Sequence, residues 1–347
     1  MRSNSLIYIL LSVSLLGLFL LDLSGGTIWL NPLSLFGEEG KIIAGGDACA
    51  PGLTRQILLN LRLPKALTAL LAGIGLSVSG LLMQTLFRNP LAGPYTLGVS
   101  SGASLGVALL TMCGFSLTAL HAAFSTFTAA ILGAALVLLL VMAVSHKVRS
   151  NVSLLIVGMM FGSIAGALVN LIQNFANPDS LKLFIVWTLG SLTNVGWQQL
   201  PLLAAVVIAG MLICLFLMKP LNGMALGEEY ARGLGIRVER VRLWIVIATG
   251  LLAGGITAYC GPIAFIGVAV PHIARGIFRS SNHRLTLPAT ALIGANILLL
   301  CDFVCSIFTY PLPISTVSAL FGAPIIIYII LTHKASFLES EDSICVC

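Results

Sequence analysis

The charged side chains that could act on another molecule are concentrated between Lys219 and Arg242. Only 9% of the chain is charged, yet this stretch holds one lysine, three glutamates and four arginines, and long apolar runs flank it. Because a charge at the centre of a bilayer costs about 2.5–3.5 kcal/mol, such a stretch is predicted to lie at a membrane surface. It is either an ordinary solvated connection or a docking surface for a soluble protein.

The order of residues inside this charged stretch predicts two short helices. Glu228 and Glu229 suit the first turn of a helix, where negative charge complements the helix dipole. Glu228 and Arg232 are four residues apart, in the orientation that favours an ion pair. The glycines after Arg232 predict the end of this helix, and residues 238–242 begin a second one. A helix, a glycine break and a second helix fit the docking interpretation.

The sequence contains no motif for enzymatic chemistry. A G-x-x-x-x-G-K-[ST] loop is absent, so the chain is not expected to hydrolyse ATP, and it has no metal-ligand cluster or nucleophile motif. Most of the eight cysteines lie in apolar runs and are interpreted as small core residues. Cys345 and Cys347 either bind metal, oxidise, or belong to a loose polar tail. We expect no catalytic residue, no metal site and no cofactor in this chain.

The composition is typical of a polytopic membrane protein, since 58% of the residues are hydrophobic. A spanning helix needs about 20 apolar residues, and continuously apolar runs indicate helices rather than strands. We predict an all-α fold of about ten transmembrane helices in one membrane domain, residues 1–333, followed by a polar cytoplasmic tail, 334–347. The predicted spans are 6–22, 64–84, 96–113, 119–145, 152–174, 198–218, 243–259, 263–280, 286–307 and 313–332.

The basic residues predict the orientation of the chain in the membrane. With the N-terminus in the cytoplasm, 13 lysines and arginines fall on the inner side and 5 on the outer side. Excess positive charge marks cytoplasmic loops, so both termini are predicted to be cytoplasmic. The net charge of +6 therefore reports sidedness and does not indicate nucleic-acid binding.

Two basic residues, Arg62 and Lys65, are placed at the outer mouth of the second span. Residues 53–63 are expected to form a short surface helix that bears Arg55 and Arg62. The pair either anchors the chain at the interface with its long side chains or forms an electropositive landing pad for an acidic partner.

Glycines recur at every fourth position in two spans, which places them on one helix face. Such faces let helix backbones approach closely in lipid, and the alternative is a smooth lining for a transport pathway. The two sets are Gly98, Gly102 and Gly106 in the third span and Gly158, Gly162 and Gly166 in the fifth.

Asp302 is the one acidic residue deep in the late apolar region. An acid inside the membrane suggests a function, such as a proton or ion relay. A relay needs partners, and the sequence shows no second buried acid. This weakens the alternative of an ion-coupled secondary transporter. A third option is a membrane-embedded structural or assembly subunit.

Six segments, in this order, resemble the FecCD family of permeases, the membrane subunits of ABC importers for iron-siderophores, haem and vitamin B12. The segments are RLPK at 62–65, SGLLMQTLFRNPLAGPYTLGVSSGA at 79–103, LGEEYARGLG at 226–235, GPIAFIGVAVPHIAR at 261–275, NHRLTLP at 282–288 and GAP at 322–324. The resemblance spans nearly the whole chain and implies ten helices per subunit in the fold of the vitamin B12 permeases.

The resemblance also implies partners and site residues. A second permease subunit completes a homodimer or close heterodimer in the bacterial inner membrane, with two ATP-binding cassette subunits below and a periplasmic or lipid-anchored substrate-binding protein above. ATP and Mg belong to the ATPase. Arg62 and Lys65 match basic positions that meet acidic residues of the binding protein. The residues that match the family's coupling helices, within 219–242, are Leu226, Gly227, Glu228, Glu229, Ala231, Arg232, Gly233, Leu234 and Gly235.

The sequence departs from the family pattern at three places. Pro311 and Ser315 replace the acid and the glycine of an acid-Leu-Pro-x-Gly run, and Cys305 replaces a basic residue three positions after Asp302. Residues 280–282 read Ser-Ser-Asn where Gly-x-Asp is usual. These changes put the geometry of binding-protein contact in doubt, and the sequence does not identify the substrate.

Overall fold

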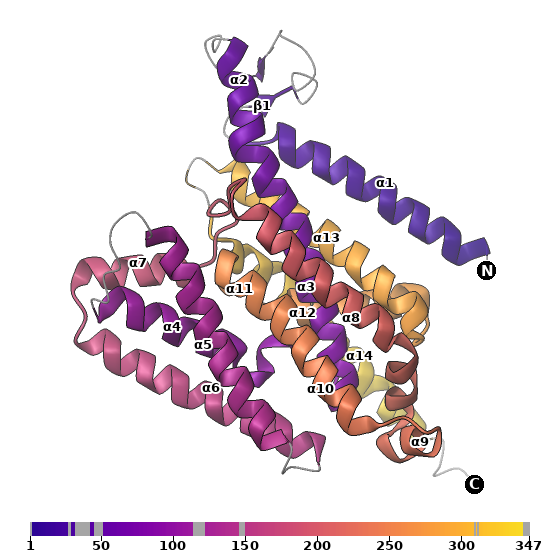
Figure 1. Cartoon of the computed structure of the whole chain (residues 1–347). Coiled ribbons are helices and arrows are strands. Elements are labelled where there is room, and N and C mark those ends of the chain that lie inside the picture. The colour runs from indigo at the N-terminus through magenta and orange to yellow at the C-terminus, as the bar shows by residue number, and fades with distance from the viewer. Residues whose placement is uncertain are drawn as a thin grey trace.

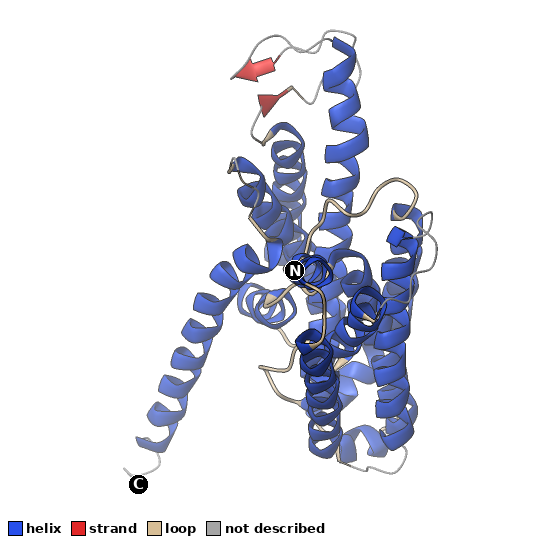
Figure 2. Cartoon of the chain, turned by 90° about the vertical axis from the view of Figure 1, so that its left-hand side faces the viewer, coloured by secondary structure: helices blue, strands red, loops and turns tan. Residues whose placement is uncertain are grey.

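The computed structural model describes residues 2–26, 29–31, 42–44, 51–113, 122–145, 150–308, 310 and 312–342. Its helices form a bundle with two short antiparallel strands at one end (Figures 1 and 2). The elements are α1 (Arg2–Ser24), β1 (Trp29–Leu30), β2 (Ile42–Ala44), α2 (Pro51–Ile57), α3 (Leu63–Phe87), α4 (Val99–Met112), α5 (Ala122–Ser145), α6 (Asn151–Asn174), α7 (Pro178–Thr188), α8 (Leu200–Leu226), α9 (Glu228–Gly233), α10 (Val238–Thr249), α11 (Gly255–Cys260), α12 (Ile266–Phe278), α13 (His283–Ile307) and α14 (Ile314–Asp342).

The all-α prediction is confirmed, and each of the ten predicted spans corresponds to an apolar helix. Within the described residues, seven helices are long and apolar enough to cross a membrane, and three shorter apolar helices account for the remaining segments. The shorter ones are Val99–Met112, Ile266–Phe278 and Ile314–Ile327.

The structure corrects the predicted boundaries at four places. The expected surface helix 53–63 is continuous with α3, because a π-helical turn at Leu58–Arg62 joins α2 to it. The expected outer loop at 174–197 contains α7. The first residues of the charged stretch belong to α8, which continues through Pro220 to Leu226. The expected loose tail is helical as far as Asp342, the last residue of α14.

Helix α3 packs on α12 and α13 through glycines whose backbones touch the neighbouring helix. A Cβ atom built on Gly73 would lie 2.4 Å from the carbonyl oxygen of Gly294, and one on Gly80 would lie 1.7 Å from that of Gly267. No side chain larger than hydrogen fits at such contacts, which give membrane helices extensive van der Waals contact. These three helices therefore form one closely packed group.

Helices α4, α5 and α6 form a second closely packed group, separate from the first in Figure 1. Cβ atoms on Gly102 and Gly106 of α4 would meet the backbone of α5 at 2.5 and 2.0 Å, and one on Gly98 would meet α6 at 2.9 Å. Gly98 precedes α4 and has φ +74°, so it ends the preceding 3-10 turn rather than sharing the helical face as predicted. Gly158 and Gly162 pack back against residues 96–101, whereas Gly166 has nothing within 4 Å.

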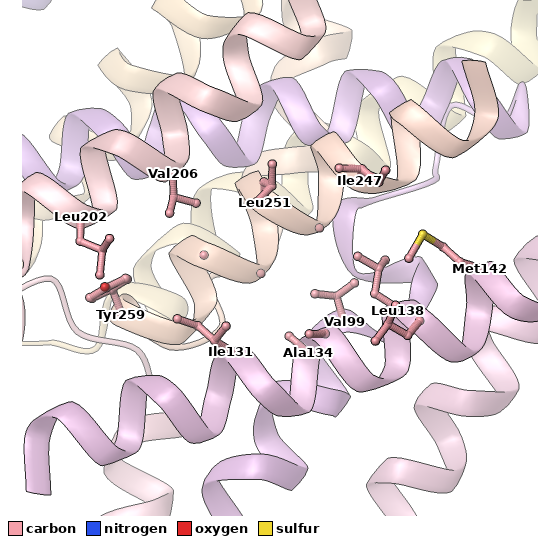
Figure 3. Close-up of a pocket in the computed structure, with 15 residues that line it drawn as sticks. Val99, Ile131, Ala134, Leu138, Met142, Leu202, Val206, Ile247, Leu251 and Tyr259 are labelled. Carbon is pink, nitrogen blue, oxygen red and sulfur yellow. The ribbon is translucent and has the colours of Figure 1, made fainter. Parts of the chain in front are cut away.

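An apolar cavity of about 410 Å³ lies beside the second group, between α5, α8 and the α10–α11 segment (Figure 3). Its wall includes Leu138 of α5, Val206 of α8 and Leu251. Residues Gly250–Gly254, between α10 and α11, form a π-helical turn that borders this cavity. Such turns are rare in helices and are often found at functional positions.

Candidate functional site

The middle of the charged stretch folds into α9, a six-residue helix between the end of α8 and the start of α10. Gly227 joins α8 to α9 with φ +130°, a backbone angle that side chains disfavour. Glu228 and Glu229 lie in the first turn, the helix ends at Gly233, and α10 begins at Val238. The predicted helix–glycine–helix arrangement is confirmed. Figure 1 shows α9 at one end of the bundle.

Helix α9 is fixed to both flanking helices. Ala231 is buried, and its carbonyl oxygen accepts a 3.0 Å hydrogen bond from the amide of Ile236. A Cβ on Gly223 of α8 would lie 2.5 Å from the side chain of Ile236, so α8 lies directly against this unit. On the other side, the Arg242 guanidinium of α10 donates to the Glu228 carboxylate at 3.0 Å.

The predicted pair between Glu228 and Arg232 is wrong. Arg232 instead pairs with Glu239 at 2.7 Å, and both side chains are more than half exposed. Arg242 is only 5% exposed, so its charge requires a partner within the protein, and Glu228 is the carboxylate that α10 brings to it. Glu228 is therefore a structural support of α9 rather than part of its outer face.

The outer face of α9, which includes the residues at its two ends, Leu226 of α8 and Leu234, combines apolar and charged side chains. Leu226, Tyr230 and Leu234 are spaced four residues apart and are 66%, 54% and 60% exposed. Glu229 and Arg232 are exposed beside them. An exposed aromatic and aliphatic row with flanking charges is typical of a protein–protein contact. Of the predicted coupling residues, Ala231 and Glu228 thus position this face, and the others lie on or next to it.

A polar cluster of Thr85, Asn222, Asn282 and His283 joins α3, the end of α8 and the start of α13; Thr85 and His283 are buried, Asn222 is half-buried and Asn282 is exposed. Asn222, near the end of α8, accepts hydrogen bonds from the amide and from Nδ1 of His283, both at 2.8 Å. Its side-chain nitrogen donates to Asn282 at 3.0 Å, and the other imidazole nitrogen lies 2.9 Å from the Thr85 hydroxyl. Sequence reasoning missed Asn222 and Thr85, because nothing in their spacing indicates contact with residues 283 and 282.

At the opposite end of α3, a second charged cluster replaces the predicted open landing pad. Lys65 pairs with Asp302 at 2.9 Å, and their side chains are 19% and 2% exposed. Arg62 Nη1 donates to the carbonyl oxygens of Leu23 and Ser24 at 2.9 and 2.8 Å. Both residues that were predicted to dock a partner, Arg62 and Lys65, thus already bind groups within this chain. By contrast, Arg55 is exposed.

The prediction that Asp302 has no buried acidic neighbour is wrong. Asp22, at the end of α1, is 6% exposed and lies within electrostatic reach of Asp302, Lys65 and Arg62. The two acids are far apart in sequence and meet because α1 packs along α13. Pro311, Cys345 and Cys347 lie outside the described residues, so the predictions on them were not tested.

Comparisons with known proteins agree with this arrangement. A sequence model of the FecCD transport family matches residues 14–332. The chain is 34% identical over 282 residues to the hemin transport permease HmuU of Yersinia pestis, covering 80% of this chain and 84% of the relative. It is 36% identical over 326 residues to the vitamin B12 import permease BtuC of Salmonella paratyphi A, covering 93% and 94%.

A solved structure has the same fold. It is described as a metal-chelate type ABC transporter in an inward-facing conformation, with a TM-score of 0.80 and 31% identity, covering 94% of this chain and 99% of that one. The ion-coupled and assembly-subunit alternatives are therefore set aside. The chain belongs to the FecCD transport family, and it is the membrane permease subunit of an ABC importer in which a partner ATPase hydrolyses ATP.

Proposed function

We propose that the outer face of α9 is the surface on which the ATPase subunit acts. The single observation that carries this proposal is the exposed set Leu226, Tyr230 and Leu234, which lies on α9 and at its two ends, while α9 itself is fixed from behind. A surface that transmits force must combine an accessible contact face with rigid support, and α9 has both. Contact residues such as tyrosine and arginine are also those that dominate protein interfaces energetically.

We further propose that the imported molecule is a large iron-chelate, haem or corrinoid. The relatives named for hemin and vitamin B12 support this class without choosing within it. A substrate-binding protein delivers the molecule on the outer side of the bacterial inner membrane. The complete importer has two permease subunits, identical or closely related, and two ATPases. The excess of basic residues on the α9 side supports a cytoplasmic position for both termini.

For the outer surface, we propose that Arg55 and Arg62 meet acidic residues of the binding protein, whereas Lys65 acts mainly within the chain. Arg55 is exposed, and Arg62 is half-buried with its Nη1 bound to backbone carbonyls. Lys65 neutralises Asp302 at 2.9 Å. Exposed charges steer the approach of a partner, whereas removing one member of a buried ion pair leaves an uncompensated charge inside the protein.

In the proposed mechanism, closure of the ATPase pair upon ATP binding displaces α9 together with its supports. The spans then exchange between outward-open and inward-open arrangements. ATP shifts this equilibrium because the ATPase contacts on α9 differ between the two states. No chemical step takes place on this chain.

The test combines uptake with disruption of the α9 face. Uptake of labelled cobalamin, hemin and a ferric siderophore panel is measured in cells with and without the chain, with ATP depleted or the ion gradient collapsed. A triple variant, Glu229→Gln with Tyr230→Ala and Arg232→Gln, should lose most ATP-dependent uptake while the permease remains folded. Arg240→Gln, an exposed change on α10, is the matched control. Normal coupled uptake by the triple variant would refute the assignment of this face.

A further inference from the structure

Asn222 occupies a position between the α9 unit and the first turn of α13. It lies one helical turn before Leu226, the last residue of α8. The next residue, Gly223, is packed against Ile236 and Ala231 of the α9 unit. Asn222 itself reaches the N-terminus of α13 through Asn282 and His283. Two adjacent residues of α8 therefore have different neighbours: Gly223 lies against α9 and the residues that follow it, and Asn222 contacts the start of α13.

The hydrogen bonds fix the orientation of the Asn222 amide. The backbone amide of His283 can only donate, so the atom facing it at 2.8 Å must be the side-chain oxygen of Asn222. The same oxygen lies 2.8 Å from His283 Nδ1, which must therefore carry a proton. The amide nitrogen of Asn222 then donates to the Asn282 oxygen, which also caps α13 by accepting from the amide of Arg284. These three hydrogen bonds of the Asn222 side chain are all directed at the start of α13.

The start of α13 is in turn tied to α3 and α12. His283 is 3% exposed, and its Nε2 lies 2.9 Å from the hydroxyl of Thr85 on α3. The neighbouring Gln84 donates to the carbonyl oxygen of Val268 at 3.0 Å and accepts from Arg275, both on α12. Since α3, α12 and α13 also touch through glycine backbones, a displacement of the first turn of α13 is expected to move all three helices.

From this geometry we infer that Asn222 is a positioning residue that transmits movement of the α8–α9 unit to α13 and its packed partners. This inference rests on the proposed function of α9 as the ATPase contact. The side-chain oxygen of Asn222 accepts hydrogen bonds from the backbone amide and from Nδ1 of His283, and through them the first turn of α13 moves with α8. Direct packing of α8 on α3 is the competing route, and the experiment separates the two.

The experiment uses hydrogen–deuterium exchange of the complete importer in nanodiscs, with and without ATP plus vanadate. In the wild-type protein, nucleotide should change exchange in both peptide 228–235 and peptide 283–290. In Asn222→Ala, peptide 228–235 should still respond, whereas the nucleotide-dependent change in 283–290 should fall at least about fivefold, the equilibrium effect of losing one ordinary hydrogen bond. This readout requires no knowledge of the transported substrate.

Two variants separate transmission from simple damage. Asn222→Asp keeps the accepting oxygen and should retain the response of peptide 283–290. Asn282→Ala is a matched asparagine-to-alanine change in the same cluster, which removes the cap of α13 but leaves the contacts between Asn222 and His283. It should lower stability and keep the response.

The outcomes distinguish the inference from the proposed function beneath it. If both peptides still respond together in Asn222→Ala, packing of α8 on α3 is sufficient and the inference is wrong. Loss of both responses in Asn222→Ala, or loss in Asn282→Ala alone, would also overturn it, because the cluster would then serve stability only. If peptide 228–235 shows no response to nucleotide in the wild-type protein, the proposed role of α9 itself fails.

Discussion

Gly106 and Gly166 occupy equivalent positions in the two glycine patterns of the sequence, but the structure assigns them opposite sensitivities to substitution. A Cβ atom on Gly106 would lie 2.0 Å from the carbonyl oxygen of Ala129, whereas nothing lies within 4 Å of one on Gly166. Cβ atoms essentially never approach closer than 3.0 Å, so Gly106→Ala requires α4 and α5 to separate locally by at least 1.0 Å. The obstacle is helix backbone, which cannot rotate away as a side chain can.

The expected effects follow from these distances. Overpacking of a close contact costs about 1–3 kcal/mol, and Gly106→Ala should lie in the upper half of that range. Gly166→Ala should be neutral or stabilising by up to about 1 kcal/mol, because alanine loses less backbone entropy than glycine in a helix. The two variants make the same chemical change, each in an apolar helix, and thus control for each other.

The assay is thermal unfolding of the purified permease in detergent, followed by tryptophan fluorescence, together with uptake in cells. We expect the midpoint temperature of unfolding to drop clearly in Gly106→Ala and not to drop in Gly166→Ala. Equal midpoints would refute the reasoning from backbone contact. Loss of uptake in Gly166→Ala at unchanged stability would instead favour the alternative in which this glycine lines the transport pathway.

Two further pairs of substitutions test the assignments of charge. Glu228→Ala should destabilise the permease by about 1.5–3 kcal/mol in thermal unfolding, because it removes the carboxylate that faces the buried Arg242, whereas Glu229→Ala should leave stability unchanged and reduce ATPase co-purification. The reverse pattern would contradict the division between support and contact face. Arg55→Glu should weaken docking of the binding protein and reduce its salt dependence, while Lys65→Met should cost about 3–5 kcal/mol of stability, because its carboxylate partner is buried. An equal loss of salt dependence in Lys65→Met would show that this lysine also contacts the partner.

Local signals in the sequence were sufficient to predict α9, the glycine break after it and the start of α10. Paired acids predicted the first turn, glycine predicted the end, and the start of α10 at Val238 agrees with the predicted second helix. The partner of Glu228 was not predictable in this way, because Arg242 meets it only after α10 turns back against α9. An i, i+4 ion pair on a helix surface contributes little free energy, whereas leaving the nearly buried guanidinium of Arg242 unpaired would be costly, so Glu228 pairs with Arg242.

Other errors had different physical causes. Asp22 was not recognised as a buried acid because its burial comes from the packing of α1 on α13, which no local pattern reports. Pro64 was interpreted as the start of a span, whereas the π-helical turn before it lets the helix continue from α2. For α7 the signal was present, since Asn177, Pro178 and Asp179 form an N-cap, a first-turn proline and a first-turn acid.

The distribution of close contacts indicates where this permease can change shape. Glycine contacts join α3 to α12 and α13, and a second set joins α4 to α5 and α6, so each group has little freedom to rearrange internally. The apolar cavity of about 410 Å³ borders α5 of the second group, and its other walls are α8 and the α10–α11 segment with the π-helical turn at Gly250–Gly254 (Figure 3). Packed interfaces switch between discrete arrangements, and side chains that line an unfilled cavity have fewer contacts to break in such a switch. Because α10 leads from the residues after α9 directly to the π-helical turn that borders this cavity, we expect a displacement of α9 to be transmitted to the cavity wall.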